Sequence, residues 1–194
     1  MILMNDIVRE GAEVLKTKAQ EVKLPLSVED EQTLIKMNEY ILNSIDPEIS
    51  EKYGLRGACG LAANQINILK RMLVMRDYDE NNQLHHYMMI NPKIISYSDE
   101  LTYLPGGEGC LSVDREVVGL VHRPRKVTVK TYLYENGEVK EVTLRLKDYI
   151  AIVFQHEYDH LNGILFVDRI NKDFPLNVPE NSTPVRFKRA EEEK

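Results

Sequence analysis

The sequence predicts an α+β fold in which mostly antiparallel strands pack around a central helix. Apolar residues recur at helical spacing over residues 28–45, and two alternating, strand-like segments flank Asn136-Gly137, a strong hairpin signal. A third segment, residues 148–161, is apolar on nearly every side. Helices of that composition are buried, so we expect this one at the centre of the fold.

The first third of the chain contains one clear helix. Ser27 and Asp30 have the spacing of a capping box in front of residues 28–45, and Pro47 follows the last apolar position. Residues 7–22 are only weakly amphipathic, and their type stays open.

The middle of the chain has the pattern of strands. Short apolar runs at 72–75 and 87–90 are separated by the polar segment 77–86, and the hairpin arms are expected at 127–134 and 138–146. Asp148 is the expected N-cap of the apolar helix, and Gly163 is its expected C′ residue.

Length and composition indicate one globular domain. The chain has 194 residues, 43% hydrophobic and 29% charged, which is enough for a sizeable core. We expect residues 1–172 to form a single catalytic domain. Residues 173–194, which contain three prolines and end in Glu-Glu-Glu-Lys, should form a surface arm or tail.

Charge and cysteine content narrow the cellular context. A net charge of −6 argues against direct nucleic-acid binding, and two cysteines argue against a secreted, disulfide-built protein. The acidic N-terminus lacks a signal-peptide pattern, and no segment approaches the roughly 20 apolar residues of a membrane span. We therefore expect a cytoplasmic protein with no membrane partner.

Residues 156–160 read His-Glu-Tyr-Asp-His and indicate a metal site. On a helix, His156 and His160 share one face and can hold the same ion. Glu157 is rotated about 100° away, a position suited to a base rather than a ligand. Catalytic metal sites usually have three protein ligands, so one more donor is needed.

The third ligand has two candidates. One zinc-protease pattern would place a histidine at position 166, but this chain has Phe166, which cannot bind a metal. Another pattern would use a downstream glutamate, of which Glu180 is the first candidate. Cys110 lies upstream in a glycine-rich segment, and its thiolate would suit zinc or ferrous iron. Without other information a lone cysteine is more often a small buried hydrophobe.

Three segments, in order, resemble the signature motifs of the peptide deformylase family. They are 58–65 (Ala-Cys-Gly-Leu-Ala-Ala-Asn-Gln), 108–112 (Glu-Gly-Cys-Leu-Ser) and 155–160 (Gln-His-Glu-Tyr-Asp-His). The resemblance extends over about residues 5–172. The segments 77–86 and 104–110 look like those of the Gram-positive, type 2 branch.

The resemblance implies a metal-dependent hydrolase of N-terminal processing in protein biosynthesis, which removes the formyl group from N-formylmethionyl chains and releases formate. It assigns Cys110, His156 and His160 to one divalent metal, natively Fe²⁺, with Ni²⁺, Co²⁺ or Zn²⁺ also accepted. Nascent chains near the ribosome would be the substrate.

The resemblance also assigns the reacting groups. Glu157 would be the general base, while the Gln65 side chain and the Leu111 backbone N–H would stabilise the oxyanion. Gly60 would allow the backbone to approach the substrate. The methionine side chain would occupy a pocket lined by Gly60, Cys59, Tyr149 and Ile152.

Supporting roles follow for three charged residues. Asp159 would orient a ligand imidazole or be a charge on the helix surface, and Glu108 and Arg123 would form an ion pair near the cysteine loop. The other histidines are expected at the surface or in loops: His85, His86 and His122.

The chain departs from the family motif at Ala58, Cys59 and Asn64, where Gly, Val or Ile, and often Pro are usual. Ala58 could restrict the backbone, and Cys59 could be open to oxidation. Two alternatives therefore stay open: a divergent paralogue with altered specificity, and a zinc metallopeptidase of the His-Glu-x-x-His type.

Overall fold

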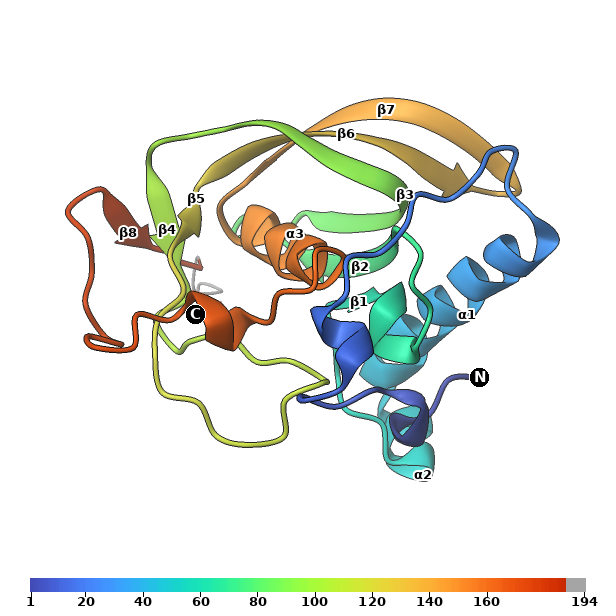
Figure 1. Ribbon diagram of the computed structural model, residues 1–194, viewed down its shortest axis with the longest axis horizontal. Helices are drawn as coiled ribbons and strands as arrows, with labels where there is room; N and C mark the ends of the chain where they lie inside the picture. Colours follow the sequence, from blue (N-terminus) through green and yellow to red (C-terminus); the bar gives the residue numbers. More distant parts are fainter. Residues whose placement is uncertain (188–194) are drawn as a thin grey trace, which may run out of the picture.

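The computed structural model describes residues 1–187 and has the predicted α+β architecture (Figure 1). The helices are α1 (Val28–Ile45), α2 (Pro47–Tyr53) and α3 (Asp148–His160), with four short 3₁₀ helices η1–η4. The strands are β1 (Gly60–Ala62), β2 (Met72–Tyr78), β3 (Leu84–Tyr97), β4 (Leu101–Tyr103), β5 (Arg123–Pro124), β6 (Lys126–Glu135), β7 (Glu138–Lys147) and β8 (Ser182–Pro184).

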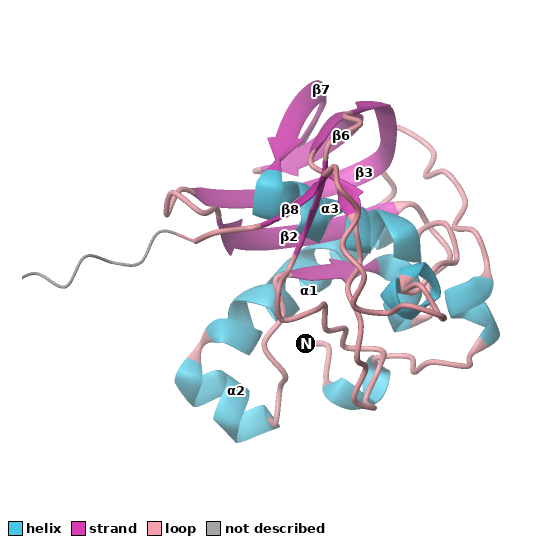
Figure 2. Cartoon of the chain, turned by 90° about the vertical axis from the view of Figure 1, so that its left-hand side faces the viewer, coloured by secondary structure: helices cyan, strands magenta, loops and turns pink. Residues whose placement is uncertain are grey.

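The strands form two sheets around α3. A five-stranded antiparallel sheet has the order β1-β2-β3-β6-β7, and a three-stranded sheet has the order β5-β4-β8. Helix α3 contacts strands of both sheets and lies near the centre of the molecule (Figure 1). Figure 2 shows α1 and α2 on the side opposite the β6–β7 hairpin. The predicted central position of the apolar helix is thus confirmed.

Helix α1 has the bounds predicted from its apolar spacing. The Ser27 hydroxyl accepts a hydrogen bond from the backbone N–H of Asp30 at 3.1 Å, which satisfies one free donor of the first turn. Pro47 ends α1 but also begins α2, where the side chain of Asp46 caps the new helix.

Strand β2 is buried on both faces, which explains its continuous apolar run. Met72 and Val74 pack with the core formed by α1, whereas Leu73 and Met75 pack with the core formed by α3. Strands β2 and β3 are both longer than the predicted segments 72–75 and 87–90. Their backbone pairing continues into the polar segment 77–86, as far as Tyr78, which lies opposite Leu84.

The β6–β7 hairpin is confirmed at the expected turn. Glu135 pairs with Glu138, and both Asn136 and Gly137 have positive φ values of 50° and 84°. A tight two-residue hairpin loop requires this conformation.

The ends of α3 match the prediction at one terminus only. Gly163 N–H bonds the His160 carbonyl and Ile164 N–H bonds the Asp159 carbonyl, both at 3.0 Å, as in a Schellman C-cap. Asp148 is not the N-cap, and that prediction was wrong. Its carboxylate accepts from Arg125 Nε at 2.6 Å, so tertiary pairing takes the oxygen that would have capped the helix.

The described part of the arm, residues 173–187, contributes a strand that the sequence did not indicate. Strand β8 runs parallel to β4, with Ser182 opposite Leu101. Three residues are too few to show an alternating pattern. In the described chain, none of the helices has the length and apolar character needed to cross a membrane.

Candidate metal centre

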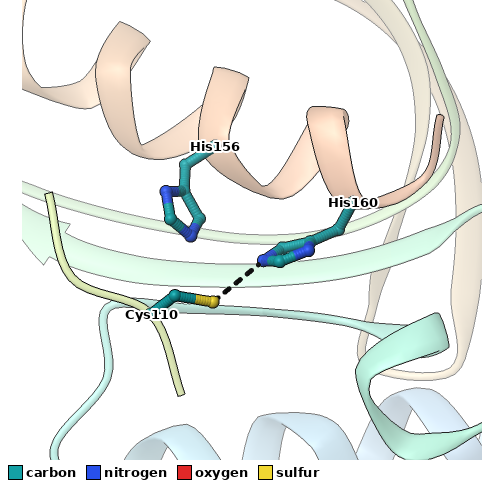
Figure 3. A group of neighbouring side chains, drawn as sticks. All are labelled: Cys110, His156 and His160. Atoms are coloured by element: carbon teal, nitrogen blue, oxygen red, sulfur yellow. Dashed lines mark hydrogen bonds between the residues drawn. The ribbon is translucent and has the colours of Figure 1, made fainter. Parts of the chain in front are cut away.

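Cys110, His156 and His160 converge on one point. Their donor atoms all lie within 4.8 Å of one another, and the three donors are buried. Figure 3 shows both imidazoles projecting from α3 towards the Cys110 side chain. The Cys110 Sγ lies 3.3 Å from His160 Nε2. One thiolate and two imidazoles form a donor set that fits zinc or ferrous iron.

The two downstream positions that the zinc-protease patterns indicated lie outside this group. Phe166 stacks on the His156 ring, with centroids 5.9 Å apart and planes 24° apart, so it packs against a ligand instead of replacing one. Glu180 is exposed in the arm. The remaining histidines also lie elsewhere: His85 and His86 on β3, and His122 just before β5.

Glu108 and Arg123 form the expected ion pair, and it reaches a metal-site residue. Glu108 contacts His156 Nδ1 at 2.7 Å and accepts from Arg123 Nε at 2.6 Å. Arg123 is only 2% exposed and also donates to Asp159 at 2.7 Å. The bond to Glu108 leaves the other ring nitrogen of His156 for a metal.

The expectations for Asp159 need correction. Its carboxylate is buried and binds Arg123 and Arg169, so it is no surface charge, and the residue that contacts a ligand imidazole is Glu108. Asp159 is connected to His156 by the hydrogen bonds of Arg123 and Glu108.

The two imidazoles have opposite electrostatic environments. Burial alone would lower the pKa of His156, but hydrogen bonds to Cys110 and Glu108 raise that pKa well above its ordinary value. Burial and the neighbouring His156 hold the pKa of His160 well below its ordinary value. Because a metal binds only the neutral imidazole, these shifts oppose metal binding at His156 and favour it at His160.

Glu157 is buried beside the ligands, and Gly60 makes room for it. Burial raises the pKa of the Glu157 carboxyl to about 7. A Cβ on Gly60 would lie 2.6 Å from both Cγ and Cδ of Glu157, so the Glu157 side chain would have to move. Gly60 is thus needed for Glu157 to occupy its position. The family resemblance indicated another reason for this glycine, namely that it allows the backbone to approach the substrate.

Gln65 and Leu111 both lie next to Cys110. The Ala62 N–H donates to Gln65 Oε1 at 2.9 Å, which directs Nε2 towards the Cys110 Sγ at 3.5 Å. Leu111 and Gln65 both line a cavity beside Cys110. Sequence reasoning missed Arg56, which donates to the Cys110 carbonyl at 3.1 Å. Because the peptide is planar and trans, holding this carbonyl directs the Leu111 N–H the opposite way.

A cavity of about 300 Å³ adjoins the site. All four expected pocket residues line it: Cys59, Gly60, Tyr149 and Ile152. The Tyr149 hydroxyl donates to Asp77 at 2.6 Å.

The structure accommodates the departures from the family motif at Ala58 and Cys59. Burial, then the charges of Glu157 and Asp77, raise the pKa of the Cys59 thiol to about 12, so the expected ease of oxidation is not supported. Both cysteines are free. Ala58 does not have a positive φ, so its Cβ causes no left-handed backbone strain.

Comparison with known proteins identifies the family. A family profile described as polypeptide deformylase matches residues 4–174. The chain belongs to the peptide deformylase family. The spacing that first indicated a zinc protease is thus part of a deformylase motif, and the metallopeptidase alternative loses its support.

Relatives of known name agree with this assignment. Peptide deformylase 2 of Bacillus cereus is 53% identical over 185 residues, which cover 95% of this chain and 99% of that protein. A Staphylococcus epidermidis peptide deformylase is 51% identical, covering 95% and 100%. The actinonin-bound class I type b peptide deformylase of Acinetobacter baumannii is 30% identical, with a TM-score of 0.66, covering 88% and 99%. The higher identity to the Bacillus and Staphylococcus proteins agrees with the type 2 resemblance.

Proposed function

We propose that this peptide deformylase removes the formyl group from N-formylmethionyl polypeptides, releasing formate and a free amino terminus. The observation that carries the proposal is the convergence of Cys110, His156 and His160 beside Glu157, at the edge of the 300 Å³ cavity. A thiolate and two imidazoles, beside a buried carboxyl group with one oxygen free of hydrogen bonds within residues 1–187, match the needs of amide hydrolysis.

Cys110, His156 and His160 would hold one divalent ion, with Fe²⁺ as the native metal and Ni²⁺, Co²⁺ or Zn²⁺ as substitutes. Such an ion lowers the pKa of water towards neutrality. The buried pair of Glu108 and Arg123 would keep His156 oriented towards it.

Glu157 would take the proton from the attacking water and pass it to the leaving amine. A carboxyl whose pKa is near 7 can accept and return a proton at neutral pH. Gln65 Nε2 and the Leu111 N–H would donate to the formyl oxygen as charge develops there. Arg56 would support the second donor by holding the Cys110 carbonyl.

The cavity would receive the methionine side chain against Cys59, Gly60, Tyr149 and Ile152. The peptide deformylase of Acinetobacter baumannii, 30% identical, has a crystal structure with Met-Ala-Ser bound. We infer that the substrates are nascent chains near the ribosome, in the cytoplasm. Residues 1–172 would be the catalytic domain and 173–194 an accessory arm.

An anaerobic assay tests the proposal. The protein is loaded with Fe²⁺, its metal content is measured, and formate release from N-formyl-Met-Ala-Ser is followed. We expect turnover by the wild type, and Glu157→Ala should keep its metal but lose activity. Metal-replete wild type that releases no formate would refute the proposal, and tight peptide binding without hydrolysis would favour the divergent paralogue.

A further inference from the structure

Asn64 joins the oxyanion side of the site to the metal side. It precedes Gln65 in η3 (Ala63–Ile66) and is fully buried. Its Nδ2 donates a hydrogen bond to the backbone carbonyl of His160, the last residue of α3. One side chain thus connects the helix that positions an oxyanion donor with the helix that carries two metal ligands.

Each of these two residues also has one buried side-chain atom without a hydrogen-bond partner within residues 1–187, namely Oδ1 of Asn64 and Nδ1 of His160. Their chemistry is complementary. An amide oxygen accepts a hydrogen bond. His160 Nε2 lies 3.3 Å from the Cys110 Sγ, and when this nitrogen binds the proposed metal, the proton of the neutral ring must be on Nδ1. Unpaired buried donors and acceptors are costly, and ligating histidines usually donate their second N–H to a fixed acceptor.

We propose that Asn64 is a positioning residue for His160, with Nδ2 on its carbonyl and Oδ1 as the acceptor of its Nδ1–H, directly or through one buried water. Two bonds to one residue fix the ring plane and the tautomer, and so present Nε2 to the metal. The inference rests on the proposed ligand role of His160. It assigns a purpose to a position where the family motif often has proline.

The test compares Asn64→Leu, which removes both polar groups at similar volume, with Asn64→Asp, which keeps an acceptor. Asn162→Leu is the matched control, because Asn162 Nδ2 also donates to a carbonyl near the end of α3, that of Tyr158 at 2.8 Å. Its Oδ1 accepts from Arg71 at 3.2 Å and not from a proposed metal ligand. Each protein is loaded with Co²⁺, and its rate of metal loss to a chelator is measured. The zinc-loaded forms are examined by NMR for a protected imidazole Nδ1–H.

We expect Asn64→Leu to lose Co²⁺ at least about tenfold faster than wild type, and Asn64→Asp and Asn162→Leu to stay within about threefold. The His160 Nδ1–H signal should disappear in Asn64→Leu alone. If Asn64→Leu does not fold, Asn64→Ser repeats the comparison.

The metal centre and the role of Asn64 can be tested separately. Wild type without a thiolate-to-cobalt absorption band would overturn the metal centre, and the inference with it. If wild type has that band, two results would overturn the inference alone. One is an Asn64→Leu protein that loses metal no faster than Asn162→Leu, and the other is an Asn64→Leu protein that retains the His160 Nδ1–H signal.

Discussion

Gly60 on β1 and Glu157 on α3 touch so closely that a single methyl group would not fit between them. A Cβ at Gly60 would lie 2.6 Å from the Glu157 Cδ. The general base of the proposed reaction therefore depends on a residue without a side chain, in a different element of the fold.

Gly60→Ala should displace Glu157 and reduce turnover by about 10²-fold while metal content stays unchanged, because a misplacement of about 1 Å has this effect on catalytic groups. Steady-state kinetics and metal analysis check it. Gly57→Ala is the control, since its nearest added contact is an ordinary 3.6 Å to the Ser44 carbonyl. Equal activity of both variants would contradict the steric role.

Glu157 should make the metal-free protein less stable as pH rises. Its folded pKa, about 7, lies above its ordinary value of 4.5, so the stabilising contribution is complete below pH 4.5 and is lost through pH 7. Without metal, Glu157→Gln should therefore be more stable than wild type by up to about 3 kcal/mol at pH 8. The difference should shrink to about 1 kcal/mol or less at pH 5.

Urea unfolding of chelator-treated protein at the two pH values measures this difference. A gap that stays constant with pH would show that Glu157 does not titrate in this range.

Arg123 should be essential to stability because it neutralises two buried carboxylates, those of Glu108 and Asp159. Arg123→Met should lower the free energy of unfolding by about 3–5 kcal/mol. Arg125→Met breaks the more exposed pair with Asp148 and should cost about 1 kcal/mol or less. Thermal or urea unfolding of the two variants compares them, and similar losses would rule out a special role for the buried network.

The two cysteines should differ in reactivity. With its pKa raised to about 12, the Cys59 thiol stays protonated at neutral pH and should react slowly with iodoacetamide. Bound metal should protect Cys110, and chelation should expose one fast-reacting thiol, located at Cys110 by mass spectrometry. Cys59→Val should leave this pattern unchanged. Labelling of Cys59 first would contradict the assignment.

Features with short-range signals could be predicted from the sequence. The Ser27 cap, the Asn136-Gly137 turn and the shared face of His156 and His160 each depend on residues within a few positions of one another. Asp148 failed as a cap for the opposite reason: Arg125, from another part of the chain, takes its carboxylate. Strand β8 exists only because β4 supplies its partner.

The sequence by itself determined the family, the α+β class and the residue types gathered at the site, because motif order and periodicity are properties of the chain. Only the tertiary structure decided that Glu108 contacts His156, that Asp159 pairs with Arg123 and Arg169, and that Gly60 makes space for Glu157. The physical reason is distance along the chain. The Glu108–His156 contact joins residues 48 positions apart, and packing, not local periodicity, brings them together.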